Sequence, residues 1–334
     1  MHRVLILHTG GTIGMAAAPG GYQPMSGFPA RLRQQLDSQA GHHLPDYAIV
    51  ELPPIDSANL RPSHWPLIAQ TLLDHWDKYA GFVILHGTDT MAWSASALSF
   101  MLRGTDKPVI FTGAQIPLIE TPSDALDNVK GALHFAATQP VREVSLYFGQ
   151  RLLRGNRSRK LATTRLDAFD SPNYPRLAEV GKDIVLHREH ILPASEKRFL
   201  MPQFDDQAVA ILTLHPGISG ASVDALTANP RLRGLILQTY GLGNAPQDDR
   251  KLINALERAA NRGITLLNTT QCLIGGVNQE TYTTCTALAR IGVIAAGDMT
   301  LEAAFAKLHF LLASANKAED VRKGLEETLC GEKS

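Results

Sequence analysis

Short apolar runs recur along the chain, and each of them ends at a glycine or another turn residue. The runs are rich in valine, isoleucine and leucine, and their apolar positions do not alternate with polar ones. Strands that are buried on both faces of a parallel sheet have this pattern. We therefore predict strands over residues 4–7, 81–87, 108–113, 144–149, 208–217, 234–241 and 263–268.

Helical patterns lie between these runs. Apolar residues at i, i+3 and i+4 predict helices over residues 64–76, 90–102, 124–138, 248–263 and 300–313. Gly263 is expected to follow a helix end, and Asp298 or Thr300 to cap a helix with Glu302 in its first turn. Strands that alternate with helices indicate an α/β protein with a mainly parallel sheet.

This alternation divides the chain into two parts. It lapses between about residues 150 and 207, where the chain is polar, charged and contains prolines, and a fresh strand–helix series begins at residue 208. We therefore expect a larger N-terminal α/β domain over 1–190, a linker over 191–207 and a smaller α/β domain over 208–334, each with a mainly parallel sheet flanked by helices.

The composition argues against several classes of partner. Thirty-two basic residues balance 32 acidic ones, so no net charge draws the chain to nucleic acid or to a membrane surface. No apolar stretch approaches the ~20 residues of a membrane-spanning helix. Three widely spaced cysteines favour free thiols in a reducing compartment, and the N-terminal apolar run is too short for a signal peptide. We expect a cytoplasmic protein with a small-molecule substrate.

Hydroxyl and small residues follow three of the predicted strands. The segment "TGGT" (9–12) follows the first, "HGTDT" (86–90) the second and "TGAQ" (112–115) the third. Ligands of open α/β sheets bind outside the carboxyl ends of the strands. These segments are therefore the candidate site, although the glycines could simply turn the chain, and Thr88 or Asp89 could cap the helix that follows.

Other motifs give weaker indications. "TGGTIG" fits neither a dinucleotide fingerprint nor a phosphate loop, and no G-x-S-x-G elbow occurs. "HREH" (187–190) lacks the spacing of H-E-x-x-H zinc helices, and with "HH" (42–43) it is interpreted as solvated loop residues; we expect no metal and no cofactor. "RGNRSRK" (154–160) is interpreted as a solvated charged face, unless Lys160 packs beside Thr88 and Asp89.

The segments "ILHTGGTIG" and "GFVILHGTDTM", with "PVIFTGAQIPL", "YGLGNAPQ" and "NTTQC", resemble the bacterial-type L-asparaginases over nearly the whole chain. Because no leader segment is recognised, the chain is expected to be most similar to the type I, cytoplasmic branch of that family. The resemblance implies hydrolysis of the side-chain amide of asparagine in a two-domain α/β protein, assembled as a homodimer or a homotetramer built from two dimers.

The resemblance also implies the site residues. Catalysis is expected from Thr12 as nucleophile, Tyr22 as its activator, and the set of Thr88, Asp89 and Lys160. The substrate-binding residues that it implies, some of them shared, are Gly11, Asp56, Ser57, Thr88, Asp89 and Ala114.

Amide hydrolysis leaves two routes open. A threonine hydroxyl is a poor nucleophile and needs an adjacent proton acceptor, which Tyr22 could supply to Thr12 and Lys160 to Thr88. Thr12 then forms an aspartyl ester that water resolves, or water attacks directly. Backbone N–H groups of Gly11, Thr88 and Ala114 are candidate oxyanion donors. The segment "GMAAAPGGYQPMSG" (14–27), which follows Thr12 and contains Tyr22, has the Gly, Ala and Pro content of a mobile lid.

Other functions remain as alternatives. Glutamine is one methylene longer than asparagine, a difference worth only ~1–3 kcal/mol, so a glutaminase-asparaginase of broader specificity is possible. The amide-cleaving subunit of a transfer-RNA amidotransferase is a related alternative. A two-lobed amino-acid sensor would need neither the paired threonines nor Lys160, and would release no ammonia. A dehydrogenase is disfavoured because the dinucleotide fingerprint is missing.

One feature departs from the family pattern. Some type I enzymes carry an allosteric asparagine site with an arginine before the "YG" turn and a threonine before the catalytic lysine. Here those positions are Gln238 and Arg159, although Thr270, Gln271 and Cys272 match the rest of that site.

We therefore predict that allosteric activation is weak or absent, because the side chains that would bind the second asparagine are missing. Initial velocity measured against asparagine concentration should follow a hyperbola. A clearly sigmoidal curve would contradict this prediction.

Overall fold

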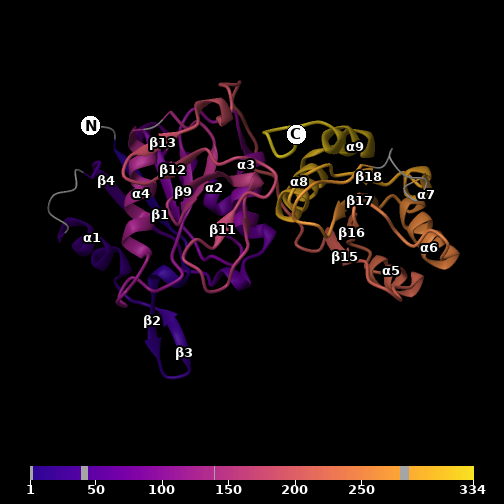
Figure 1. Ribbon diagram of the computed structural model, residues 1–334, viewed down its shortest axis with the longest axis horizontal. Coiled ribbons are helices and arrows are strands. Elements are labelled where there is room, and N and C mark those ends of the chain that lie inside the picture. Colours follow the sequence, from indigo (N-terminus) through magenta and orange to yellow (C-terminus); the bar gives the residue numbers. More distant parts are fainter. Residues whose placement is uncertain (1–2, 39–43, 139, 279–285) are drawn as a thin grey trace. The chain divides into compact units, whose positions relative to one another are not determined.

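The computed structural model describes residues 3–38, 44–138, 140–278 and 286–334. The chain forms two compact units, residues 1–201 and 202–334, which are described separately (Figure 1). His42, His43 and Cys285 lie outside the described residues, whereas Cys272 and Cys330 are free thiols. No helix in the described ranges is both long enough and apolar enough to cross a bilayer.

The first unit is built on an eight-stranded sheet in the order β13-β12-β9-β8-β7-β5-β1-β4. The five strands from β8 to β4 are parallel, and β9, β12 and β13 extend the sheet antiparallel at one edge. The strands are β1 Val4–His8, β4 Tyr47–Glu51, β5 Gly81–Leu85, β7 Val109–Thr112, β8 Val144–Phe148, β9 Arg151–Arg154, β12 Ala178–Val180 and β13 Ile184–Leu186.

The strand order reverses beside β1. The chain runs from β1 to β4 on one side, and then crosses over β1 to β5 on its other side. The parallel strands thus follow a 2-1-3-4-5 order, in which the crevice for a ligand opens between the first and third strands. In this chain those strands are β1 and β5.

Helices cover both faces of this sheet because its central strands are apolar throughout. Val4 and Ile6 of β1 share a core with α1 (Phe28–Ser38) and α4 (Ala125–Thr138), while the intervening residues point to the opposite face. There α3 (Met91–Met101) packs on β7 and β8 and contacts α2 (Trp65–Leu73). Ten of the eleven α3 residues are buried, which explains its nearly continuous run of small and apolar residues.

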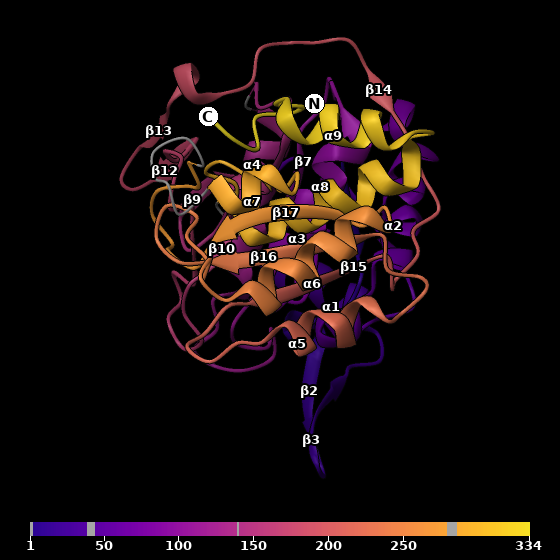
Figure 2. The ribbon, with the colours of Figure 1, turned by 90° about the vertical axis from the view of Figure 1, so that its right-hand side faces the viewer.

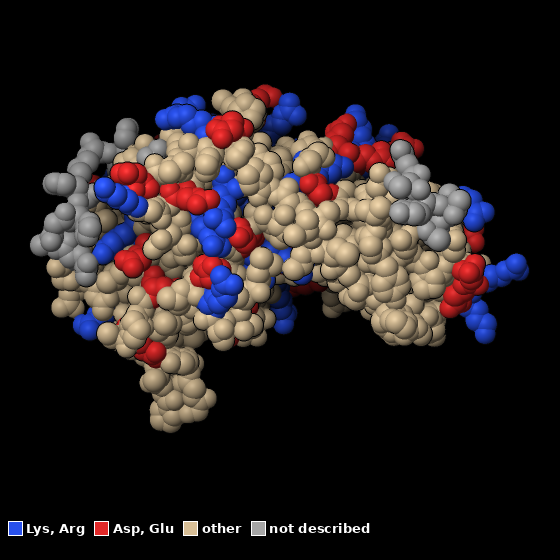
Figure 3. Space-filling model, in the orientation of Figure 1, with Lys and Arg blue, Asp and Glu red and all other residues tan. Residues whose placement is uncertain are grey.

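A hairpin replaces the featureless lid that the sequence indicates after Thr12. Strands β2 (Met15–Ala18) and β3 (Gly21–Pro24) pair antiparallel and project from the body of the first unit (Figures 1 and 2). The hairpin carries no charged side chain, and its tip is uniformly tan in Figure 3. An isolated two-stranded hairpin is only marginally stable in water.

Short elements occupy the stretch where the sequence pattern lapses. Strands β10 (Arg159–Lys160) and β11 (Phe169–Asp170) pair antiparallel, and β14 (Arg198–Phe199) pairs with β6 (Leu102–Arg103). This last pairing ties residues 191–201 to the first unit. Single 3-10 turns are found at Thr12–Gly14, Ser57–Asn59, Pro62–His64, Trp76–Lys78, Gly155–Arg157 and Arg188–His190.

The second unit has a four-stranded parallel sheet in chain order (Figure 2). Its strands are β15 Val209–Thr213, β16 Gly234–Thr239, β17 Thr265–Thr270 and β18 Ile294–Ala295, and its helices are α5 Gly220–Thr227, α6 Arg250–Asn261, α7 Thr286–Arg290, α8 Leu301–Ser314 and α9 Ala318–Glu326. Thr300 caps α8 by accepting a hydrogen bond from the Ala303 N–H, and Gly263 follows the end of α6 with φ +86°.

A fully buried ion pair fixes the C-terminal tail to the second unit. Lys307 Nζ on α8 lies 2.6 Å from Glu332 Oε1, and both side chains are 0% exposed. The carboxylate also accepts the N–H groups of Leu329 and Cys330. Burial alone would raise the pKa of Glu332, but Lys307 and these N–H groups hold it below its usual value.

We predict that Glu332→Gln destabilises the protein by about 3 kcal/mol, because it leaves the Lys307 ammonium buried without a counter-charge. Urea-induced unfolding measures this loss. The matched double variant, Lys307→Met with Glu332→Gln, should recover much of it. Since the folded pKa of Glu332 is lowered, the stabilisation is complete above pH ~4.5 and is lost as the pH falls through the folded value. Equal stability of the single variant and the unsubstituted chain would contradict this account.

Candidate active site

Two glycines bring the loops after β1 and β5 into backbone contact. A Cβ placed on Gly11, whose φ is +93°, would lie 2.4 Å from both the Cα and the N of Gly87. No larger residue fits this approach. The next residues along each loop are Thr12 and Thr88, so the contact places both threonines at the mouth of the crevice between β1 and β5.

A third loop, which follows β4, packs against Gly87 and against Gly10. A Cβ on Gly87 would lie 2.4 Å from Ser57 Oγ, and a Cβ on Gly10 would lie 2.4 Å from the Ile55 carbonyl oxygen. Thr90 Oγ1 donates to the Ser57 carbonyl at 2.8 Å. Ser57 is buried here, whereas Asp56 is exposed and accepts the Ala58 N–H as the cap of a 3-10 turn.

Lys160 joins the second threonine and the acid. Its Nζ donates to Thr88 Oγ1 at 2.8 Å and to Asp89 Oδ1 at 2.7 Å. The three residues come from β10 and from the loop after β5, which are separated by about 70 positions in the chain. Thr88 is buried and the Lys160 side chain is 21% exposed, whereas the Asp89 side chain is 62% exposed.

Several hydrogen-bonding groups at the crevice have no partner within the described part of the chain. They are the Thr12 hydroxyl and the N–H groups of Gly11, Thr88 and Ala114. Unpaired N–H groups at strand ends form a ready site for negative charge. A hydroxyl with no partner beside such groups fits a bound ligand better than a structural role.

The loop after β7 is fixed by an acid that the sequence did not single out. The Asp124 carboxylate accepts the N–H groups of Gln115 and Ile116 and the amide of Asn128. The Gln115 side chain in turn accepts from Thr88 at 3.4 Å, and its amide donates to the Thr163 and Arg165 carbonyls. Gln115 thereby links the buried Thr88 to the loop that follows Lys160.

His86 supports the loop that follows β5. It is buried, its Nδ1–H donates to the Gly87 carbonyl at 2.8 Å, and its Nε2 accepts from Ser94 Oγ at 2.9 Å. Burial lowers the pKa of His86 to about 4, although the bond to Gly87 acts in the opposite direction. A neutral imidazole with both nitrogens engaged is a structural support and not a proton shuttle.

Tyr22 reaches the body of the first unit from β3. Its hydroxyl donates to Glu120 Oε1 at 2.5 Å, and this hydrogen bond raises the pKa of the phenol. Tyr22 itself is 52% exposed. Glu120 was not expected from the sequence, because it lies in a loop without a periodic pattern.

The alternative roles of these residues can now be compared with the structure. The N-cap of α3 is Thr90, so neither Thr88 nor Asp89 caps the helix, and the capping interpretation is wrong. The glycines do turn the chain, but Gly11 also serves the close approach to Gly87. Lys160 does pack beside Thr88 and Asp89, so the condition under which that segment was expected to take part in the site is met.

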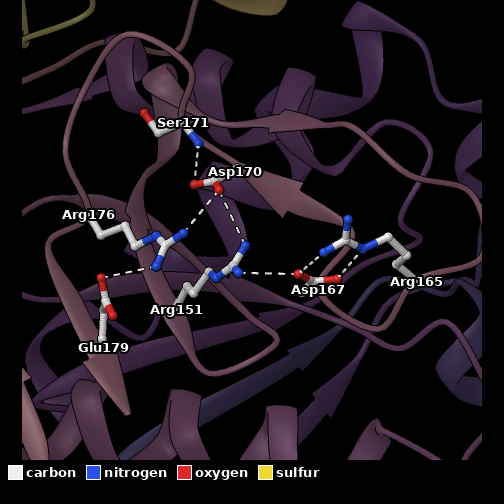
Figure 4. Close-up of polar contacts among 7 residues, drawn as sticks. All are labelled: Arg151, Arg165, Asp167, Asp170, Ser171, Arg176 and Glu179. Carbon is white, nitrogen blue, oxygen red and sulfur yellow. Dashed lines mark hydrogen bonds and ion pairs between the residues drawn. The ribbon is translucent and has the colours of Figure 1, made fainter. Parts of the chain in front are cut away.

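An ion-pair network surrounds β11, the strand that pairs with Lys160's strand β10 (Figure 4). Arg151 pairs with Asp167 at 3.2 Å and with Asp170 at 3.3 Å. Asp170 lies on β11, opposite Arg159 of β10, and also accepts from Arg176. Exposed pairs contribute little singly, but a shared network restricts several side chains at once.

The candidate allosteric residues lie together at the carboxyl ends of β16 and β17. Gln238 Oε1 accepts from Thr213 at 2.7 Å, and the Gln271 amide donates to the Gln238 and Leu214 carbonyls. Thr270 Oγ1 accepts the Cys272 N–H. The Gln238 side chain is thus engaged within its own sheet.

Comparison with protein-family models gives two matches. Residues 3–192 match "Asparaginase, N-terminal", and residues 208–325 match "Glutaminase/Asparaginase C-terminal domain".

Similar proteins cover nearly the whole chain. L-asparaginase 1 of Escherichia coli (strain K12) is 44% identical over 98% of this chain and 97% of its own length. The crystal structure of L-asparaginase I from Vibrio cholerae is 42% identical with a TM-score of 0.89, covering 100% of this chain and 99% of the other. The thermostable L-asparaginase from Thermococcus kodakarensis has a TM-score of 0.90 at 33% identity, covering 99% of each chain.

Proposed function

The chain belongs to the asparaginase family, and we propose that it hydrolyses the side-chain amide of L-asparagine to L-aspartate and ammonia. The full-length similarity to L-asparaginases of 33–44% identity supports this activity. The observation that carries the proposal at the level of residues is the contact of Lys160 with Thr88 and Asp89, beside the paired glycines.

In the proposed reaction Thr12 Oγ1 attacks the carboxamide carbon. The hydroxyl proton passes to an acceptor, the C–N bond breaks, and the nitrogen leaves as ammonia after taking up a proton. Water then attacks the aspartyl ester, and Thr12 regains its hydroxyl as aspartate leaves. The Thr12 hydroxyl has no hydrogen-bond partner among the described residues, which supports its choice as nucleophile. We assign Thr88, which is held by Lys160, to orient water in the second step.

Each tetrahedral intermediate carries a negatively charged oxygen. The N–H groups of Gly11, Thr88 and Ala114 are the donors we assign to it, because none of them is engaged by another described residue. One such donor is worth about 3 kcal/mol in comparable sites.

The α-carboxylate of the substrate needs a hydrogen-bond donor, and its α-ammonium group needs a negatively charged acceptor. We assign the α-carboxylate to Ser57, whose hydroxyl lies against Gly87, and the α-ammonium to Asp89. The Asp56 carboxylate would repel the substrate's carboxylate, and its bond to Ala58 suits a residue that shapes the loop. Asp89 is the more exposed partner of Lys160, so one face of it is available to substrate.

Three broader properties belong to the same proposal. We infer a homodimeric or homotetrameric assembly and a cytoplasmic location, both from the resemblance to type I asparaginases. Glutamine remains a second candidate substrate, supported by the description "Glutaminase/Asparaginase" of the C-terminal match and by the small energetic difference of one methylene. We further propose that the β2–β3 hairpin closes over bound substrate, since it carries Tyr22 and the residues of β3 are all exposed.

Ammonia release from asparagine and from glutamine tests the activity and its selectivity together. Thr12→Ala and Thr88→Val should each lower kcat/KM by at least about 1,000-fold, and Lys160→Met by about 100- to 10,000-fold, because each removes a reacting or proton-transferring group. Thr71→Val and Lys182→Met, with circular dichroism on every variant, are the matched controls. Near-normal rates in both site-threonine variants would refute the assignment. A covalent adduct found on Thr12 by mass spectrometry would exclude direct attack by water.

The Tyr22–Glu120 pair can be tested by conservative changes. If Glu120 draws the phenol proton so that Tyr22 can accept one from Thr12, Glu120→Gln should lower kcat at least tenfold at nearly constant KM, and Tyr22→Phe by about 100-fold. An amide oxygen still accepts the hydrogen bond, so a pair that only fastens the hairpin would tolerate Glu120→Gln. A kcat within twofold of the unsubstituted enzyme would therefore contradict the relay.

A further inference from the structure

A second cluster of chemically active side chains lies at the 3-10 turn Arg188–His190. His187, Glu189 and His190 each offer one donor atom, and these atoms all lie within 4.8 Å of one another. Glu189 Oε1 is 3.7 Å from His187 Nδ1 and 3.9 Å from His190 Nε2. From this geometry we propose that the cluster is a binding site for a divalent transition-metal ion, Zn²⁺ in the first instance.

The local backbone accounts for the convergence of the two histidines. The His190 N–H donates to the His187 carbonyl at 3.0 Å, the i to i+3 bond of a 3-10 turn. Side chains three positions apart eclipse in such a turn, and the two imidazole centroids are 5.4 Å apart. The H-E-x-x-H spacing that "HREH" lacks applies to an α-helix, whereas this segment forms a 3-10 turn.

The distances suit a tetrahedral ion after small side-chain adjustments. Ligand atoms about 2.0–2.1 Å from a tetrahedral Zn²⁺ are separated by ~3.4 Å. The two separations from Glu189, 3.7 and 3.9 Å, exceed this by a few tenths of an ångström, and the two histidine donor atoms lie within 4.8 Å of each other. Two imidazoles and one carboxylate are also the donor set of open zinc sites, in which water fills the fourth position.

A hydrogen bond outside the cluster prepares His190 for coordination. His190 Nδ1 lies 3.2 Å from the Arg176 carbonyl oxygen. A carbonyl only accepts, so Nδ1 donates its proton to it, and Nε2 is the ring nitrogen on the side of Glu189 that is available to a metal ion. Metal-binding histidines commonly make this second contact, which fixes their tautomer and ring orientation.

Distant side chains hold the turn in place. The His190 carbonyl accepts from Arg154 at 2.8 Å and from the Tyr174 hydroxyl at 3.0 Å, and the His187 N–H donates to the Leu177 carbonyl. The imidazoles are only 33% and 28% exposed, whereas Glu189 is 67% exposed. Two ligands are thus already ordered, and the third completes the site from the solvent side.

The charge and the donor types restrict the ion. Glu189 supplies one negative charge, and the guanidinium of the neighbouring Arg176 is paired with Asp170 and Glu179, which lessens its repulsion of a cation. Imidazole nitrogen favours Zn²⁺, Ni²⁺ and Cu²⁺, whereas Mg²⁺ requires a nearly complete shell of oxygen ligands. We expect Zn²⁺ to bind and Mg²⁺ at the same concentration not to bind.

Isothermal titration of the full chain with ZnCl₂ tests the site, with Co²⁺ absorption as an independent readout of coordination. His190→Ala and Glu189→Gln should each weaken binding at least about tenfold. His215→Ala is the matched control, because His215 is an exposed histidine whose Nδ1 also contacts a backbone carbonyl. It should bind as the unsubstituted chain does.

Thermal unfolding gives a third readout that does not depend on catalysis. Zn²⁺ should raise the Tm of the unsubstituted chain and of the His215 variant, but not that of Glu189→Gln, whose exposed position spares the fold. Comparison among variants also separates this site from zinc held by the exposed thiol of Cys272. The proposal is overturned if the unsubstituted chain shows no saturable zinc binding, or if His190→Ala and Glu189→Gln bind zinc as tightly as it does.

Discussion

The closeness of two backbones at Gly11 and Gly87 is the constraint on which the candidate site depends. The sheet order sets a crevice between β1 and β5, but only the absence of side chains at these glycines allows the two loops to touch. That contact places Thr12 and Thr88 on one crevice, where nearby N–H groups have no partner among the described residues. Buried donors without partners are costly, and a ligand oxygen that accepts from them offsets this cost when it binds.

The position of the Lys160 ammonium group depends on a different part of the fold. Lys160 lies on a two-residue strand that is not part of the main sheet, so the sheet does not fix its position. The ion pairs of Arg151 and the hydrogen bonds of Gln115 hold the strand and loop around Lys160 instead. These residues follow no periodic pattern in the sequence. A catalytic lysine must keep its nitrogen within hydrogen-bond distance of its partner, and such surrounding contacts determine whether it does.

The sequence predicts most elements of the main sheets and their helices, and it misses several loops and short strands that complete the site. Buried parallel strands and core-facing helices were predicted because burial on one or both faces imposes a period, and all of those predicted are present. Strand β4 was missed because its middle residues are only half-buried, and the β2–β3 hairpin because alanine, glycine and proline hide its pairing. Among the site residues, Thr12 and Thr88 were predicted from their positions after buried strands, whereas the catalytic role of Lys160 came from the family resemblance. Glu120 acts from a loop through one hydrogen bond and Asp124 through several, and neither residue belongs to a periodic pattern.

The turn at His187–His190 illustrates why spacing rules fail outside regular structure. A motif such as H-E-x-x-H combines residue types with an assumed α-helical backbone, and the spacing has no meaning when the backbone differs. Here a 3-10 bond brings residues three apart into register, and Arg154 and Tyr174 hold that turn from other segments. The arrangement of donor atoms is therefore a tertiary property. It follows that short polar motifs in loops should be judged by the side chains that fix their backbone, since those contacts decide which donors converge.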